Sequence, residues 1–229
     1  MTEHAPTGQI DQQFDPIALQ LEQVVEQIGF NPDMATRAHD VGNWSANDLV
    51  AISTLLHSAV APEAAPNPTD TPMKMHRRDG TVAHQFMEPE QRYSLYEHAT
   101  NLVHKLAEQT PAGGEDAFLR RAGNVFALSV VLAHPFEDGN GRTSRTLAQL
   151  IRSGYDPTNS DSVNDLATIS TERDKMPGDT RMYGFMPWAG VNQEPAELLD
   201  NVAALDIPIG DDAQYQNQKE MLISSPYIN

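Results

Sequence analysis

The sequence predicts an all-α domain that carries one small β-hairpin. Apolar residues recur at the three- and four-residue spacing of amphipathic helices along most of the 229 residues. One dipeptide, Asp79-Gly80, lies between two stretches of mixed polarity and is a two-residue hairpin signal. No repeat of solenoid or propeller period is present. A chain of this length suits one domain with a short extension.

Two helices are predicted in the first 60 residues. The first spans "DPIALQLEQVVEQIG", where Asp15 is a candidate cap, Pro16 suits the first helical position and Gly29 favours a stop. The second begins at Ser45, because Asp48 completes a capping-box pattern. Their predicted apolar faces are Ile17, Leu21, Val24, Val25 and Ile28, then Leu49, Ile52, Leu55 and Leu56.

A loop and the hairpin follow. The stretch 61–72 contains four prolines, which remove backbone donors and cannot continue a helix. The hairpin is predicted over 73–87. Its register places Met73 opposite Phe86 and Met75 opposite His84.

The rest of the chain is predicted to be helical. Helices are expected at about 88–109, at 116–133 with increasing apolar character, and after the motif as far as Gly154. A short helix near 162–173 and a helix at about 194–205 precede a polar tail. The candidate core residues of the first of these helices are Tyr93, Tyr96, Leu102, Val103 and Leu106.

Composition excludes several function classes. A net charge of −17 argues against nucleic-acid binding and repels anionic membranes. The absence of cysteine excludes disulfides and thiolate catalysis. The most apolar window, 125–133, is too short to span a bilayer, and no standard secretory signal precedes it. A cytoplasmic location is therefore expected, although delivery by a specialised secretion system would leave no such signal.

The stretch "HPFEDGNGRTSR", residues 134–145, combines the components of an anion site. The "GNG" at 139–141 lies between two predicted helices, so its backbone N–H groups are placed to form a phosphate cradle at a helix N-terminus. Arg142 and Arg145 are three apart on the first turn, roughly opposite the apolar face. We expect both guanidinium groups to reach the same anion.

Two further residues extend this site toward chemistry. Asp138 stands before the glycines, and Mg²⁺ commonly takes one or two carboxylates while substrate phosphates supply other ligands. Glu137 is an alternative ligand, although we expect it to face solvent. His134 has an ordinary pKa of about 6.5, so neutral imidazole can accept a proton from a hydroxyl. The residues indicate a magnesium-nucleotide site where a hydroxyl attacks phosphorus.

Each of these residues also has a simpler interpretation. His134 alone is more often a helix-end residue bonded to a carbonyl than a base. The two arginines alone are more often a solvated face, and Asp-Gly and Asn-Gly are common turn dipeptides. Neither GxxxxGK[ST] nor a full GxGxxG occurs, because Ser144 stands where the third glycine would be.

The whole motif resembles the signature of the Fic (filamentation induced by cAMP) family, HxFx[DE]GNGRxxR, and matches every specified position. The upstream hairpin lies where that family keeps its flap. The resemblance implies a Fic-type helical bundle over about 41–190, with an N-terminal helical extension at 1–40 and a C-terminal helix and polar tail at 191–229.

The resemblance also implies a role for each motif residue. His134 would be the general base, Asp138 would hold Mg²⁺, and Phe136 would be structural. The phosphates of ATP would be wrapped by Gly139, Asn140 and Gly141 and contacted by Arg142. Arg145 would stabilise the outer phosphate and the leaving pyrophosphate. Most studied members transfer AMP to a Ser, Thr or Tyr hydroxyl of a protein, which the hairpin would clamp as an added strand.

Two departures from the family pattern concern regulation and the nucleotide. Many members carry an inhibitory [ST]xxxE[GN] helix whose glutamate engages the second motif arginine. The nearest string here, "TISTER" at 168–173, ends in Arg173 and is an accidental match. Either a separate antitoxin-like protein supplies the glutamate, or the enzyme is unrestrained, or the motif is degenerate. Aromatic candidates for adenine contact are Tyr183, Phe185 and Trp188, which are more often core residues.

The sequence therefore predicts a protein adenylyltransferase that uses ATP and Mg²⁺. Its expected partners are a hydroxyl-bearing target protein and a separate inhibitor, with no nucleic acid and no membrane. A Fic-fold transferase of another nucleotide or phospho-donor, or a catalytically silent binding module, is the alternative.

Overall fold

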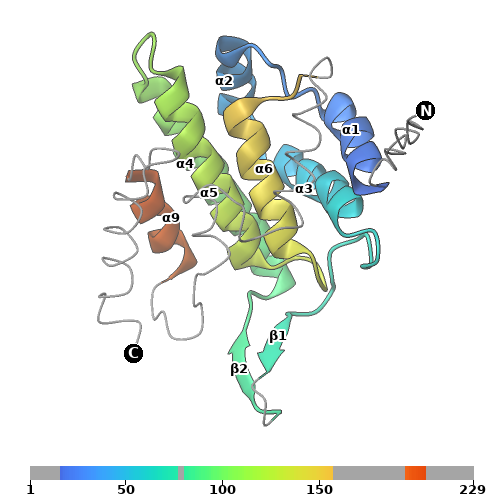
Figure 1. Ribbon diagram of the computed structural model, residues 1–229. Coiled ribbons are helices and arrows are strands. Elements are labelled where there is room, and N and C mark those ends of the chain that lie inside the picture. Colours follow the sequence, from blue (N-terminus) through green and yellow to red (C-terminus); the bar gives the residue numbers. More distant parts are fainter. Residues whose placement is uncertain (1–15, 77–79, 157–193, 205–229) are drawn as a thin grey trace, which may run out of the picture.

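The structure is a computed structural model that describes residues 16–76, 80–156 and 194–204. The elements of these residues are arranged as a helical bundle from which a hairpin projects at one end (Figure 1). Their bounds are α1 (Pro16–Ile28), α2 (Met34–Gly42), α3 (Ala46–Val60), β1 (Lys74–His76), β2 (Val82–Gln85), α4 (Pro89–Gln109), α5 (Glu115–Ala133), α6 (Asn140–Ser153) and α9 (Pro195–Ala204). The predicted all-α fold class with a small hairpin is confirmed.

Helix α5 forms the centre of the bundle and packs against α2, α4, α6 and α9. Its residues 122–131 are buried without interruption, so this part of the helix has no solvent-facing side. A helix that is apolar all round is stable only when other elements enclose it. The predicted increase in apolar character is confirmed, and α5 delivers His134 from the middle of the core.

Helix α6 lies directly against α5 (Figure 1). The two backbones approach closely at Gly123 of α5, where an added Cβ would lie 3.2 Å from the carbonyl oxygen of Ala148. Glycine at this position therefore permits the close approach, because a Cβ would push the Ala148 carbonyl away by a few tenths of an ångström. Nearby, the buried guanidinium of Arg152 donates to the side-chain oxygen of Asn124. The contact between α5 and α6 sets the position of the segment that joins them.

The hairpin has the predicted register. Strands β1 and β2 are antiparallel, and Met75 pairs with His84. The backbone N–H of Phe86 donates to the carbonyl of Met73 at 2.9 Å. A bulge between Met75 and His76 shifts the remaining pairing, which strengthens the local twist. The chain enters α4 from Phe86, so the hairpin is attached at the base of that helix.

Among the N-terminal helices, the predicted start of α3 is confirmed, whereas α2 was not predicted. Ser45 and Asp48 form the predicted capping box at the start of α3. Helix α2 was not predicted, because its polar sequence "MATRAHDVG" lacks a clear apolar stripe. Its signal is Asp33, whose carboxylate accepts a bond from the N–H of Thr36 as an N-cap.

The predicted core face of α4 is partly wrong. Tyr93 is 44% exposed, whereas Leu95 and Ala99 are buried. The buried position in the first turn belongs to Arg92, whose guanidinium donates to the carbonyls of Thr69 and Thr71. Tyr93 lies about 100° further round the helix. A polar contact from the preceding loop thus decides which residue of this turn is buried.

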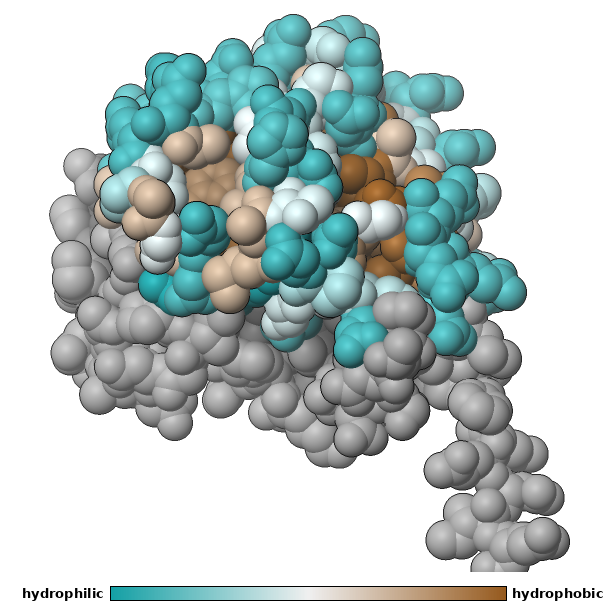
Figure 2. Space-filling view, turned by 90° about the horizontal axis from the view of Figure 1, so that it is seen from above, coloured by the Kyte–Doolittle hydropathy of each residue, from teal (hydrophilic) through white to brown (hydrophobic). Residues whose placement is uncertain are grey.

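The surface seen in Figure 2 is mostly hydrophilic, and hydrophobic residues show in recesses between polar side chains. In the described part of the chain, none of the helices combines the length and apolar character of a membrane-spanning segment.

Arg37 of α2 donates hydrogen bonds to the last backbone carbonyls of α6. It is 3% exposed, and its guanidinium donates to the carbonyls of Ile151 and Arg152 at 2.9 Å each. It also donates to the carbonyls of Asn31 and Pro32. The last carbonyls of a helix lack partners within the helix, and a cation there also complements the helix dipole. Arg37 therefore supports α6 from the end opposite the motif.

Replacement of Arg37 by Met is expected to lower the free energy of unfolding by about 2–5 kcal/mol, because buried carbonyls lose their donors. Urea unfolding measures the change. Lys105→Met, on the exposed side of α4, removes a cation in the same way and should stay within about 0.5 kcal/mol of the wild type. Equal losses in both variants would contradict this role of Arg37.

Candidate active site

His134 stands where the chain leaves α5. Its backbone has a φ of +43°, in the left-handed region, and its N–H closes the helix by donating to Val130 at 3.0 Å. Among the described residues it is the one non-glycine with positive φ. Such a conformation costs about 1–3 kcal/mol and persists only where surrounding contacts enforce it. The imidazole stacks on the ring of Phe86, with centroids 3.7 Å apart and planes at 13°.

The turn after His134 is closed by the side chain of Asn140. Its oxygen accepts from the N–H of Phe136 at 3.0 Å, and its amide donates to the Phe136 carbonyl at 2.7 Å. Phe136 itself is 1% exposed, as predicted for an anchor of the loop. The side-chain amide of Asn140 therefore holds the turn through both its oxygen and its nitrogen.

Gly139 occupies a position that only glycine fits. Its φ is +78°, and an added Cβ would lie 2.5 Å from the Cβ of Ala61 and 3.2 Å from the ring of His57. Both the backbone conformation and the space exclude a side chain. The turn can therefore press directly against the end of α3.

The N-terminus of α6 presents unused backbone donors. Its first intrahelical bond runs from Thr143 N–H to the carbonyl of Gly139, at 2.9 Å, and no side chain among the described residues caps it. The N–H groups of Asn140, Gly141 and Arg142 lie before that bond, in the first turn. Donors at this end, together with the helix dipole, favour an anion. The phosphate cradle stays a prediction, and the first turn of α6 is the part of the site where it would lie.

Arg145 folds back over the same turn. Its side chain is 7% exposed, and a Cβ on Gly141 would lie 3.0 Å from its Nη1. The missing side chain of Gly141 thus leaves room for this guanidinium. A positive group over the first turn adds to the attraction for a phosphate.

Arg142 has a different environment from the one predicted. Its Nη1 donates to the Val60 carbonyl at 2.9 Å, and its Nη2 contacts Glu63 and, at 3.2 Å, the carboxylate of Asp138. The hydrogen bond from Arg142 lowers the pKa of the Glu63 carboxyl group. Arg142 therefore points toward the end of α3 and two acids. The expectation that both arginines reach one anion applies to Arg145 more directly than to Arg142.

The side-chain carboxylate of Asp138 is the candidate metal ligand. Its side chain is 74% exposed, and one oxygen accepts from the N–H of Gly139 at 2.6 Å. Within the described residues, no three or more histidines and acids gather as a metal cluster. One accessible carboxylate beside a phosphate cradle fits Mg²⁺, which keeps waters and takes phosphate oxygens. Glu137 is exposed, as predicted.

His57 of α3 was not predicted to belong to this site. Its side chain is fully buried, its Nε2 lies 2.9 Å from the carbonyl oxygen of Asp138, and its ring stacks on Phe136 with centroids 3.8 Å apart. Burial lowers the pKa of His57, and the bond to Asp138 opposes that shift. The available signal was a histidine at helical spacing from two apolar residues, eight positions after Leu49 and three before Val60.

Thr69 and Arg92 tie the proline-rich loop to the motif, and neither was predicted. The N–H of Thr69 donates to the carbonyl of Pro135 at 2.8 Å. Arg92, 5% exposed, donates to the carbonyl of Thr69 at 2.7 Å. A buried guanidinium needs such acceptors to offset its lost hydration. The loop after α3 and the start of α4 therefore support the motif from outside.

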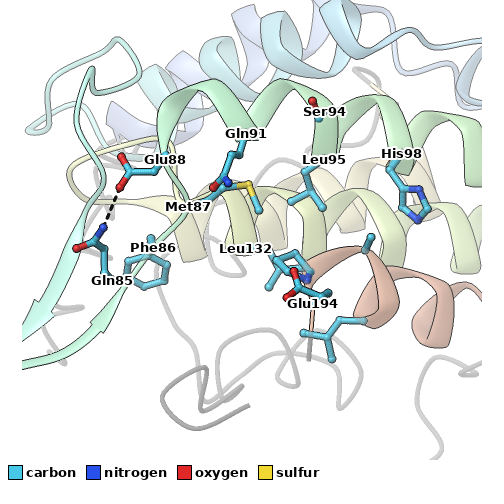
Figure 3. Close-up of a pocket in the computed structure, with 13 residues that line it drawn as sticks. Gln85, Phe86, Met87, Glu88, Gln91, Ser94, Leu95, His98, Leu132 and Glu194 are labelled. Carbon is cyan, nitrogen blue, oxygen red and sulfur yellow. Dashed lines mark hydrogen bonds between the residues drawn. The ribbon is translucent and has the colours of Figure 1, made fainter. Parts of the chain in front are cut away.

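A cavity of about 630 Å³ opens beside the base of the hairpin (Figure 3). Phe86, which stacks on His134, forms one end, and Gln85 bonds to Glu88 nearby at 2.9 Å. Along α4 the lining includes apolar and polar side chains, and α5 and α9 close the other side. The lining includes Met87, Gln91, Ser94, Leu95 and Leu132.

Several predictions concern residues outside the described part of the chain, among them the cap at Asp15 and Asp79 of the hairpin turn. They also include the short helix and "TISTER" string near 162–173, the aromatic residues Tyr183, Phe185 and Trp188, and the polar tail.

Comparison with protein families gives one match, to the Fic/DOC family, over residues 43–151. The matched range begins just before α3, includes the motif and ends at Ile151 in the last turn of α6, and it supports a Fic domain in this part of the chain. No curated protein and no solved structure matches. The predicted domain limits at 41 and 190 stay a prediction.

Gly139→Ala is expected to lower the free energy of unfolding by about 2–4 kcal/mol, from the left-handed backbone and the clash with Ala61. Gly29→Ala is the matched control, because Gly29 has a φ of +77° and open space around it. It should cost about 1 kcal/mol. Adding Ala61→Gly to Gly139→Ala should recover part of the loss in urea unfolding. No recovery would contradict the steric account.

The lowered pKa of His57 predicts a component of acid sensitivity. The unfolded chain binds a proton at His57 near pH 6.5, whereas the folded chain resists that proton, so falling pH favours unfolding. The contribution is complete above about pH 6.5 and declines below it. Unfolding free energies at pH 5 and 7 should differ more in the wild type than in His57→Gln. Equal differences would refute the assignment.

Proposed function

We propose that the Fic domain matched over residues 43–151 transfers AMP from Mg-ATP to a Ser, Thr or Tyr hydroxyl of a target protein. One observation carries the proposal: the connection between α5 and α6 brings a histidine together with an uncapped helix N-terminus under Arg145. A general base and an anion site within one turn suit attack on a phosphate ester.

His134 acts as the general base in this proposal. The target hydroxyl attacks the α-phosphorus of ATP and gives its proton to the imidazole of His134. The bond from the α-phosphorus to the bridging oxygen breaks, and pyrophosphate leaves. Stacking on Phe86 holds the plane of the imidazole ring, so that its nitrogens keep their direction toward the substrate.

The phosphates bind at the first turn of α6. Backbone N–H groups of Asn140 and Gly141 bind them. Gly139, whose own N–H donates to Asp138, shapes the turn that presents these donors. Arg145 stabilises the charge that develops on the leaving pyrophosphate. Arg142 contributes positive charge while it orients Asp138. Asp138 would hold Mg²⁺, whose chemistry is to neutralise charge on the phosphate oxygens.

The cavity beside Phe86 supports a nucleotide as the donor. Its volume of about 630 Å³ is in the usual range for small-molecule sites. The apolar side chains of Met87, Leu95 and Leu132 suit the faces of a base, and Gln91 and Ser94 offer polar groups for its edge. We assign the base to this cavity. A different base in the same place is the alternative, because the phosphate cradle recognises only the phosphates.

Two partners follow from the proposal. The target protein adds a strand to the hairpin, which places its hydroxyl near His134. A separate antitoxin-like protein supplies an inhibitory glutamate to Arg145, since the sequence offers only the accidental match at 168–173. The reaction is assigned to the cytoplasm, where ATP is abundant.

Labelled ATP tests the reaction. We expect label from the α phosphate, but not from the γ phosphate, to stay on protein after incubation with Mg²⁺ and cell lysate. His134→Ala should reduce transfer by about 10²- to 10⁴-fold, which is the usual contribution of a general base. His39→Ala is the control, because His39 lies on α2 with a side chain 78% exposed.

The other outcomes are equally informative. Transfer of γ label alone would replace AMP transfer with kinase chemistry. Transfer of α label from another nucleotide, and not from ATP, would change the donor. A folded protein that transfers no label from any nucleotide would be a binding module.

A further inference from the structure

We propose that His57 is a positioning residue of this reaction: it holds the peptide bond between Asp138 and Gly139 in the orientation that the metal ligand and the phosphate cradle require. The inference rests on the proposed function and deepens it. His57 itself touches neither substrate nor metal in this proposal and acts through the peptide.

The contacts of His57 converge on the turn. Its Nε2 lies 2.9 Å from the carbonyl oxygen of Asp138, its ring stacks on Phe136, and a Cβ on Gly139 would lie 3.2 Å from it. The side chain is fully buried within α3. A polar ring in an apolar core has a cost that only its hydrogen bond offsets. An apolar residue would fill the same space without holding the carbonyl.

The Asp138 carbonyl belongs to the turn and not to the helix. The first helical hydrogen bond of α6 uses the carbonyl of the next residue, Gly139. A carbonyl accepts, so His57 must donate from Nε2–H. The hydrogen bond therefore requires the neutral tautomer with its proton on Nε2, or the doubly protonated ring.

Planarity transmits this contact across the peptide. In a trans peptide the carbonyl oxygen and the following N–H point in opposite directions. His57 draws the Asp138 oxygen toward α3, so the N–H of Gly139 must point away from α3. There it donates to the carboxylate of Asp138 at 2.6 Å. The hydrogen bond from His57 thus sets the peptide and, together with the contact from Arg142, the direction of the proposed Mg²⁺ ligand.

The contact from His57 matters because residue 139 is a glycine. Glycine allows both signs of φ, so rotation of the preceding peptide meets little steric resistance. A rotated peptide would withdraw the N–H from Asp138 and place a carbonyl dipole beside the phosphates, where it repels their charge. Helix α3 holds the peptide in place through His57, and it also holds Arg142 through the Val60 carbonyl.

His57→Leu and His57→Gln separate the hydrogen bond from packing. Leu fills the space without a donor, whereas the Gln amide can donate to the Asp138 carbonyl. His104→Leu is the matched control, because His104 lies 3.1 Å from the Trp44 carbonyl oxygen by its Nε2, away from the motif. Loss of an outer support typically costs 10- to 100-fold in metal affinity or activity.

The decisive readouts are Mg-ATP binding by calorimetry and the Mg²⁺ dependence of label transfer, each per folded molecule. His57→Leu should weaken both by about 10- to 100-fold, His57→Gln should recover most of the loss, and His104→Leu should match the wild type. A His57→Leu protein with wild-type binding and Mg²⁺ dependence would overturn the inference. A His57→Leu protein that is less stable, but whose folded fraction binds Mg-ATP as the wild type does, would also overturn it.

Nitrogen NMR of the wild type tests the contact without activity or mutants. We expect a proton on Nε2 of His57, and the tautomer with its proton only on Nδ1 would refute the proposal even if His57→Leu does not fold. A wild type that binds Mg-ATP but transfers no label would reject the proposed reaction and leave the role of His57 testable by binding. A wild type that binds no Mg-nucleotide would overturn both.

Discussion

The close packing of α6 on the buried helix α5 constrains every other feature of the site. Gly123 lets the two backbones meet beside Ala148, and the polar end of α6 is satisfied by Arg37. With both helices fixed, the segment from His134 to Gly139 must reverse direction over a few residues. This reversal explains the left-handed backbone of His134 and the positive φ of Gly139. The proposed chemistry is located in this short connection.

The connection is held by hydrogen bonds from parts of the chain that are distant in sequence. Asn140 closes it from within, His57 reaches it from α3, and Thr69 reaches it from the proline-rich loop. Each of these groups meets a backbone group of the connection, and His57 and Thr69 do so from outside the motif. The side chains proposed to act on the substrate, His134, Asp138 and Arg145, lie in this held segment or in the first turns that follow it.

Prediction from the sequence succeeded where the signal was local. The capping box at Ser45, the hairpin register around Met75, and the apolar run into His134 depend on neighbouring residues. It failed where a distant partner decided the outcome. Arg92 is buried and Tyr93 exposed because a loop carbonyl accepts from the guanidinium, and α2 owes its place to the contacts of Arg37. Helical periodicity does not contain that information.

The motif by itself determined which residues form the candidate site, because a histidine, an acid, two glycines and two arginines lie within twelve positions. Only the tertiary structure decided how the members divide the work. Arg145 covers the α6 N-terminus, while Arg142 contacts Glu63 and Asp138. His57 is more than 70 residues before the motif, yet it contacts the motif backbone. Such contacts arise from the packing of helices, which brings together residues that no local pattern connects.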